Sequence, residues 1–307
     1  MFTKMNRWQR FGIGLGIVLV VLIAGFLIVI QAANTWGATQ AEVAKSLPGD
    51  EFATHPYVSW DNAATIHAPL SQVWPWIAQI GDDRAGYYSY TFIERAVTGL
   101  LMPGADLSLY YNNADRIHPE WQNPPIGKTM IADMLKVKAY EPNNYLLSNV
   151  TDGEFVWNWG WFLEPVDAGN TRLHVRMRLQ VPEAVKNPLV TFFFSAGGFI
   201  MEQNMIQGIT QRAEGSGEPA NIETFEIALW LAAFLAGLIA AYEFVFGRGE
   251  VKALGVGLAA VAVLFVITYV QPAIGLRVAF DLVLWVGAIW VLRRPRQTAV
   301  RLVEQAA

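Results

Sequence analysis

The chain has 307 residues, of which 53% are hydrophobic and only 16% charged, and its formal net charge is −4 at pH 7. The charged fraction is below the roughly 25% usual for soluble domains, and the negative net charge argues against a nucleic-acid-binding protein, which would need a clustered basic face. With no cysteine, the chain cannot form disulfides, a thiolate nucleophile or a cysteine-ligated metal site.

The first predicted element is a membrane-spanning helix over the uncharged apolar run from Phe11 to Ala33. A helix needs about 20 apolar residues to cross a bilayer core, and a signal-peptide core has about 7–15. We therefore expect a retained anchor rather than a cleaved leader. The C-terminal region predicts three further spans, at Phe225–Phe246, Ala253–Val270 and Ile274–Leu292.

Lysine and arginine residues flank these spans on one side only. With four spans, the basic flanks would all face the cytoplasm, so both termini would be cytoplasmic and the intervening domain would lie outside the plasma membrane. The flanking residues are Lys4, Arg7, Arg10, Arg248, Lys252, Arg293, Arg294, Arg296 and Arg301. We expect a tip and anchor (1–33), a soluble domain (34–214), a linker (215–223), three transmembrane helices (224–293) and a cytoplasmic tail (294–307).

Within the soluble domain, the first half predicts short helices around one strand. A helix over Thr39–Lys45 is followed by a strand over Tyr57–Ile66 and a helix from Pro69 to Ile80, because proline suits a first helical turn. Thr91 and Glu94 have the spacing of a capping box for a helix that ends near Thr98. The Pro-, Asn- and Asp-rich stretch 103–127 predicts a long irregular connection.

The second half predicts a strand meander and one long helix. The strands are expected at Met130–Tyr140, Tyr145–Val150, Glu154–Glu164 and Thr171–Val181. Asn187 and Pro188 then have the cap and first-turn residue types of a helix that ends near Ala213. The order predicts an α+β helix-grip fold, in which a curved antiparallel sheet surrounds a long C-terminal helix and leaves an apolar cavity between them.

Several motifs in this region resemble bacterial members of the SRPBCC superfamily, which contains the START lipid-transfer domains and the polyketide cyclase/dehydrase group. They include Ile66-His67-Ala68-Pro69, Val73-Trp74-Pro75-Trp76, Arg84-Ala85-Gly86-Tyr87-Tyr88, Pro119-Glu120-Trp121-Gln122 and Met201-Glu202. The resemblance covers Val58 to Glu214 and excludes the membrane spans. It implies the START-like fold but little about function, because such folds include binding proteins and enzymes alike.

The loop Asp82–Tyr90 is the first candidate site. It would form a rim over the cavity mouth, where Arg84 contacts an anionic head group and Tyr87 and Tyr88 pack on an apolar ligand. The alternative is a structural loop in which Arg84 pairs with Glu94 or Asp115.

A second cluster lies in the long connection and comprises Asp115, Arg116, His118, Glu120 and Trp121. A carboxylate beside a histidine could perform acid–base chemistry, but we favour a structural brace between Arg116 and Glu120 that holds the loop. The chain has four histidines, no two of them at helical ligand spacing, and we expect neither a metal site nor a cofactor.

Two predicted strands alternate strongly. The strand at 154–164 places Phe155, Trp157, Trp159, Trp161 and Leu163 on one face. This ladder could line a cavity or fill the core. The next strand places an arginine row, Arg172, His174, Arg176 and Arg178, on one face, which would be solvated or would contact the cavity.

We therefore predict ligand-binding residues and no catalytic residue. The candidates are Arg84, Tyr87, Tyr88, Glu94, Asp115, Arg116, Glu120, Trp121, Trp157, Trp159, Arg176 and Met205. In the last span, Arg277 and Asp281 lie one turn apart and predict a local ion pair.

The favoured function is membrane-anchored binding, and conceivably transfer, of a hydrophobic or amphiphilic small molecule or lipid. One alternative is a cyclase/dehydrase-type enzyme that uses two of Glu94, Asp115, His118 and Glu120 as acid and base. The other is a structural or regulatory membrane protein whose domain contacts a partner.

Overall fold

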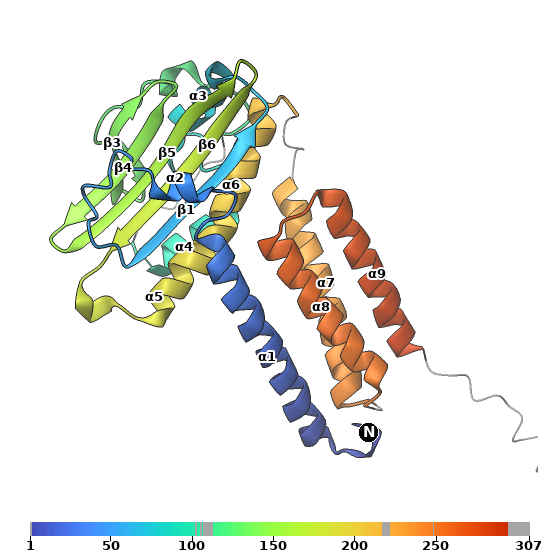
Figure 1. Cartoon of the computed structure of the whole chain (residues 1–307). Helices are drawn as coiled ribbons and strands as arrows, with labels where there is room; N and C mark the ends of the chain where they lie inside the picture. Colours follow the sequence, from blue (N-terminus) through green and yellow to red (C-terminus); the bar gives the residue numbers. More distant parts are fainter. Residues whose placement is uncertain are drawn as a thin grey trace, which may run out of the picture. The chain divides into compact units, whose positions relative to one another are not determined.

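The computed structural model describes residues 2–101, 103–104, 106, 113–216, 222–247 and 249–293 (Figure 1). Arg248, linker residues 217–221 and the predicted tail 294–307 lie outside the described residues. The chain divides into two compact units, one formed by residues 26–220 and the other by residues 1–25 with 221–307.

A six-stranded antiparallel sheet organises the unit 26–220, with the strand order β1-β6-β5-β4-β3-β2. The strands are β1 (Val58–Ile66), β2 (Thr129–Ile131), β3 (Leu135–Glu141), β4 (Tyr145–Asp152), β5 (Phe155–Asp167) and β6 (Asn170–Gln180). β1 therefore pairs with the last strand rather than with the next one, which encloses the intervening helices on one side of the sheet.

One predicted strand is in fact two. The stretch expected as a single strand from Met130 to Tyr140 turns back at Ala132 and Asp133, which have positive φ angles of 47° and 58°. The Thr129 hydroxyl accepts a hydrogen bond from the Asp133 N–H at 2.9 Å, which supports the turn. The result is the short hairpin of β2 and β3.

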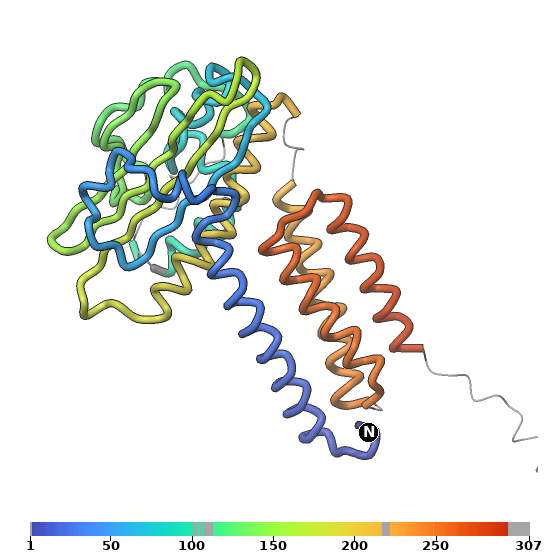
Figure 2. Tube along the Cα trace, in the orientation of Figure 1, coloured from blue at the N-terminus to red at the C-terminus, as the bar shows by residue number. Residues whose placement is uncertain are grey.

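The helices of this unit are close to the predicted ranges. They are α2 (Gln40–Ala44), α3 (Leu70–Ala78), α4 (Thr91–Leu101), α5 (Pro188–Phe192) and α6 (Gly198–Ala213), with single turns at Pro119–Trp121 and Glu183–Val185. The Asn187 side chain caps α5 by accepting from the N–H groups of Leu189 and Val190, at 3.0 and 3.2 Å. Between α5 and α6 the chain stays helical through a π-helical turn, Phe193–Gly197, so one rod extends from 188 to 213 (Figures 1 and 2).

The core lies between the sheet and the helices α3 and α6. It joins sheet residues such as Trp161 and Leu173 to Ile77 of α3 and to Ile206 and Ile209 of α6. The predicted helix-grip arrangement, a sheet packed around a long C-terminal helix, is confirmed by this topology.

In the described part of the chain, four helices are long and apolar enough to cross a membrane, as the sequence predicts. They are α1 (Arg7–Ala33), α7 (Ile222–Val245), α8 (Val251–Tyr269) and α9 (Ile274–Leu292). The last three pack through small residues, with Ala233 and Ala236 of α7 and Ala288 of α9 fully buried. Small residues let helix backbones approach closely, which is how helices associate in lipid.

The predicted ion pair in α9 is wrong. Arg277 pairs with Glu226 of α7 instead of Asp281, and its Nε donates to the Pro272 carbonyl at 2.7 Å. Both carboxylate oxygens of Asp281 are buried without a hydrogen-bond partner among the described residues. The i, i+4 rule compares positions on one helix only, and here a neighbouring helix offers the closer carboxylate.

Candidate functional site

A largely apolar cavity of about 320 Å³ lies between the sheet and the helical rod. Its walls come from α4, β5, the π-helical turn with α6, Trp60 of β1 and the β2–β3 hairpin. This volume falls within the roughly 300–1,000 Å³ of small-molecule sites, which are mostly apolar with a few placed polar groups.

The aromatic ladder of β5 forms both a cavity wall and a core layer. Phe155, Trp157 and Trp159 line the cavity, whereas Trp161 is fully buried beneath it. Trp159 stacks on Tyr87 with ring centroids 6.1 Å apart, and Trp157 meets Phe194 edge-on at 5.7 Å. The two sequence interpretations of the ladder therefore apply to successive parts of one strand.

Glycine at the start of α6 lets β1 approach the rod closely. A Cβ atom at Gly198 would lie 2.5 Å from the Trp60 ring, a distance that real contacts do not reach. Trp60 and Gly198 both line the cavity, beside the π-helical turn. Such turns are rare and often occur at functional sites, because they reposition side chains within a helix.

Glu202 of α6 is a cavity-lining carboxyl group that was not among the ligand-binding residues predicted from the sequence. It lines the cavity, is 1% exposed and accepts hydrogen bonds from Asn62 Nδ2 at 2.8 Å and from Trp159 Nε1 at 3.2 Å. Burial raises the pKa of Glu202 to about 8, against the opposing effect of hydrogen bonds from Asn62, Trp159 and Trp60. The carboxyl group is therefore mainly protonated at neutral pH.

The sequence did contain a signal for this residue. Glu202 lies three positions after Phe199 and three before Met205, both buried, so it occupies the apolar face of the helix. A carboxyl on that face has to be paired, neutral or functional, because a buried charge without a partner is costly.

Of the predicted rim residues, only Tyr87 lines the cavity. The Tyr88 hydroxyl donates to the Trp76 carbonyl at 2.8 Å, and the Arg212 guanidinium lies 4.9 Å from the Tyr88 ring. Tyr88 thus connects α3 and α6 instead of covering a ligand.

Within the described residues, Arg84 forms no ion pair with Glu94 or Asp115, the two partners that the structural alternative predicted. It is 2% exposed, its Nε lies 3.7 Å from the Asp83 carboxylate, and its NH2 group donates to the Met130 sulfur at 3.0 Å. Burial lowers the pKa of the Arg84 guanidinium. Arg84 therefore stabilises the loop from the protein interior and is not placed to contact an anionic head group.

The second predicted cluster lies apart from the cavity, and none of its members lines it. His118 stacks on Trp121 at 4.0 Å and contacts Glu120 at 3.2 Å, while the Asp115 carboxylate lies 3.7 Å from His118. The Arg116 carbonyl accepts from Gln79 at 3.1 Å, which ties the connection to α3. Asp115, His118 and Glu120 therefore lie together but away from the cavity, and Glu94 is the one member of the predicted acid–base set that lines it.

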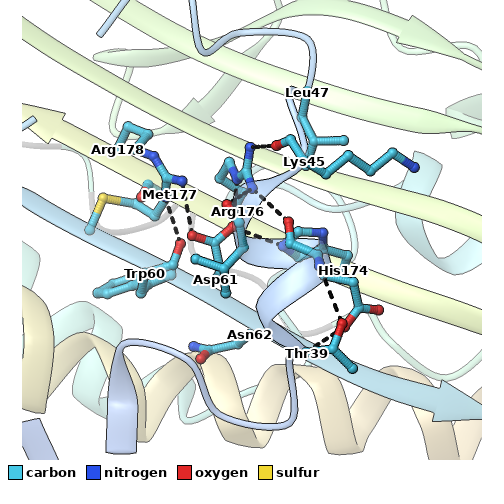
Figure 3. Close-up of polar contacts among 12 residues, drawn as sticks. Thr39, Lys45, Leu47, Trp60, Asp61, Asn62, His174, Arg176, Met177 and Arg178 are labelled. Atoms are coloured by element: carbon cyan, nitrogen blue, oxygen red, sulfur yellow. Dashed lines mark hydrogen bonds and ion pairs between the residues drawn. The ribbon is translucent and has the colours of Figure 1, made fainter. Parts of the chain in front are cut away.

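The arginine row of β6 lies on the sheet face opposite the cavity, beneath residues 34–57, which we call the outer strap (Figure 3). Arg176 donates to Asp61 at 2.5 Å, to Asp50 at 2.7 Å and to the Glu42, Val43 and Lys45 carbonyls at 2.7–3.0 Å. Arg176, which we expected at the cavity, is instead occupied by structural contacts.

Asp61 is the centre of this outer cluster. Asp61 is 2% exposed. In addition to Arg176, its carboxylate contacts His174 Nε2 at 2.9 Å and the Arg178 guanidinium at 2.9 Å. Burial alone would raise the pKa of Asp61, but the hydrogen bonds from His174 and Arg176 and the charge of Arg178 hold it below its usual value. The buried carboxylate is therefore charged and fully paired.

Comparison with protein-family models gives no match, and comparison with curated proteins gives none either. Among solved structures, the chain is similar to a START superfamily protein from Mycobacterium smegmatis, with 12% identity, a TM-score of 0.28, and coverage of 51% of this chain and 97% of that one. For a protein from Mesorhizobium loti the identity is 14% and the TM-score 0.29, and the similarity covers 52% of this chain and 100% of that one. For a polyketide cyclase-like protein from Corynebacterium glutamicum the identity is 21% and the TM-score 0.22, and the similarity covers 50% of this chain and 79% of that one.

The unit 26–220 has a helix-grip fold. Its own strand order, the helices inserted after β1 and the C-terminal rod give this result. Of the predicted ligand-binding residues, five line this cavity: Tyr87, Glu94, Trp157, Trp159 and Met205.

Proposed function

We propose that the START-like domain binds a hydrophobic or amphiphilic small molecule, with a membrane lipid as the leading class. The observation that carries the proposal is the cavity of about 320 Å³, walled by aromatic and aliphatic side chains. Apolar burial contributes about 25 cal/mol per Å², so covering roughly 300 Å² of ligand would contribute about 7 kcal/mol before the costs of association.

The anchor gives this function a location. The four candidate spans would hold the domain next to a bilayer, where apolar ligands are concentrated. The lysine and arginine flanks favour cytoplasmic termini and an extracytoplasmic domain in the plasma membrane. In this arrangement the domain would receive ligand from the outer surface or pass it on there.

Two substitutions on α4 test the binding function. Val97 lines the cavity, whereas Leu100, three residues on, is 78% exposed and does not. Val97→Trp should fill the cavity and lower affinity for an apolar fluorescent probe at least tenfold, while Leu100→Trp should bind like the parent protein. Both variants are purified as full-length protein in mild detergent, and bound lipid is measured by native mass spectrometry.

Matched thermal unfolding of the two variants shows that each is folded. Equal probe binding by Val97→Trp and Leu100→Trp, together with no copurifying ligand in the parent protein, would overturn the proposal.

A further inference from the structure

Glu202 is a buried carboxyl group at the wall of a mostly apolar cavity that Glu94 and Thr98 also line, and its surroundings are unlike those of an ion-pairing residue. Its donors, Asn62 Nδ2 at 2.8 Å, Trp159 Nε1 at 3.2 Å and the indole of Trp60, are uncharged amide and indole groups. The charge that acts on it, from Asp61, is negative. The arginines of this region, Arg176 and Arg178, are committed to Asp61 on the other face of the sheet.

These surroundings favour the neutral acid, in which one oxygen carries a proton. A protonated carboxyl provides one O–H donor in addition to its acceptor lone pairs. Both oxygens of Glu202 already accept from the protein, so the donor is the part of the group that the protein leaves for a ligand. The raised pKa, about 8, agrees with this protonation state at neutral pH.

The same wall holds a second donor. Trp157 lines the cavity, and its indole Nε1 is buried without a hydrogen-bond partner among the described residues. Buried donors without partners are rare in folded proteins and indicate a missing acceptor. The polar capacity left unused at Glu202 and Trp157 therefore consists of donors.

We propose that the cavity ligand carries an uncharged oxygen acceptor, such as the carbonyl of a ketone, aldehyde or ester, and that this oxygen accepts a hydrogen bond from Glu202. The inference rests on the proposed binding function and specifies its ligand class. A hydrocarbon would leave the donor unsatisfied. An alkyl carboxylate would bring a second negative group toward Asp61, and an alkylamine placed at Glu202 would require Glu202 to ionise in the buried wall.

Four probes of one matched chain length separate these classes: a methyl ketone with a ¹³C-labelled carbonyl, an alkane, a primary amine and a carboxylate. Binding to the full-length protein in detergent is followed by tryptophan fluorescence, and the infrared C=O stretch of the bound ketone reports its hydrogen bond. We expect the ketone to bind at least tenfold more tightly than the alkane, with a C=O stretch shifted to lower frequency than in the detergent.

Variants at position 202 assign the effect to this side chain. Glu202→Gln keeps an N–H donor and an acceptor and should bind the ketone within about threefold of the parent, a factor worth well under 1.4 kcal/mol. Glu202→Met should lose the ketone preference and the carbonyl shift while it still binds the alkane. Glu183→Met, at an acidic residue outside the cavity lining, is the control and should change neither readout.

The outcomes are distinct. If no probe binds, and Val97→Trp behaves like Leu100→Trp, the binding function itself fails and this inference fails with it. If the alkane binds and Val97→Trp blocks it, but the ketone shows no preference or keeps its carbonyl shift in Glu202→Met, only the ligand class is overturned. Tightest binding of the amine, abolished by Glu202→Gln, would also overturn it, because it would show an ionised carboxylate.

Discussion

At Glu202, burial and hydrogen bonding act on the carboxyl group in opposite directions. Burial in the apolar wall opposes ionisation, while the N–H groups of Asn62 and Trp159 favour the charged form. Burial is the larger effect, because the group is 1% exposed and no cation in the described part of the chain neutralises it. The buried face of α6 therefore carries a neutral carboxylic acid at a position where most helices have an aliphatic residue.

This balance predicts how stability depends on pH. In the folded protein the pKa of Glu202 is about 8, against a usual value of 4.5 that the unfolded chain would show. Between these values the unfolded chain releases the proton and the folded protein retains it, so the free energy of unfolding falls as pH rises from about 5 to 8. Each pKa unit corresponds to about 1.4 kcal/mol, which gives an upper limit of roughly 4 kcal/mol over this range.

The measurement is the denaturant unfolding of full-length protein in detergent, at pH 5 to 9, for the parent and Glu202→Gln. The glutamine variant cannot titrate at this position, so its stability should fall less across the range than that of the parent. Parallel curves for the two proteins would show that Glu202 is ionised throughout.

Individual side chains were the least predictable level of this structure. Tyr87, Trp159 and Met205 line the cavity as expected, since strand alternation and helix periodicity place them on the inner faces. The prediction of Arg84 at the cavity rim was wrong, because a charged loop residue is usually solvated. Here the adjacent Asp83 and the Met130 sulfur permit its burial. Contacts of this kind join residues far apart in the chain, and no local pattern reveals them.

At the scale of elements, the guanidinium of Arg176 makes the largest group of contacts that hold the outer strap on the sheet. Arg176 donates to three carbonyls at the end of α2, where a positive charge also complements the helix dipole. Arg172 adds a pair with Glu42, whose pKa it lowers to about 2. The N–H groups of Asp61 and Ala63 donate to Asn34 and Trp36 at 2.8 and 2.9 Å, so the strap also covers the edge of β1.

We therefore expect Arg176→Gln to loosen the strap. The change leaves Asp61 and Asp50 without their shared cation, and breaking a buried ion pair typically costs about 3–5 kcal/mol. Hydrogen–deuterium exchange should rise in residues 40–50, and the unfolding midpoint should fall.

Arg95→Gln, on the exposed side of α4, is the matched control and should leave both measurements unchanged. Unaltered protection of residues 40–50 in Arg176→Gln would contradict the role assigned to this arginine.

The sequence predicted the elements far better than their outer surroundings. The alternation of β5 and β6 and the Asn187–Pro188 start of the rod determine the sheet and the helix that encloses the cavity. The same alternation separates the arginine row from the tryptophans, but it cannot show what covers the outer face. That covering comes from the strap, more than a hundred residues earlier in the chain.

At the scale of the whole molecule, the four candidate spans and their basic flanks predict which parts of the chain lie on each side of the membrane. Because the chain has no cysteine, this topology can be tested by labelling single introduced cysteines. Single cysteines at Thr3, Glu183 and Thr298 are the only thiols in each variant, and none of them removes a basic residue. One span, α1, separates Thr3 from Glu183, and the three helices α7–α9 separate Glu183 from Thr298. If all four helices cross the membrane, the odd number of crossings on each side would place the two terminal positions together and the domain opposite them.

We expect a membrane-impermeant maleimide to label Glu183→Cys in intact cells and to label Thr3→Cys and Thr298→Cys only after lysis. The positive-inside distribution of Lys4, Arg7, Arg10 and Lys252 is the physical reason. The reverse pattern would place the cavity in the cytoplasm and leave its proposed ligand class intact, because that class depends on Glu202 and Trp157. Labelling of only one terminal position in intact cells would mean an odd number of spans, and would exclude at least one of the four helices from the bilayer.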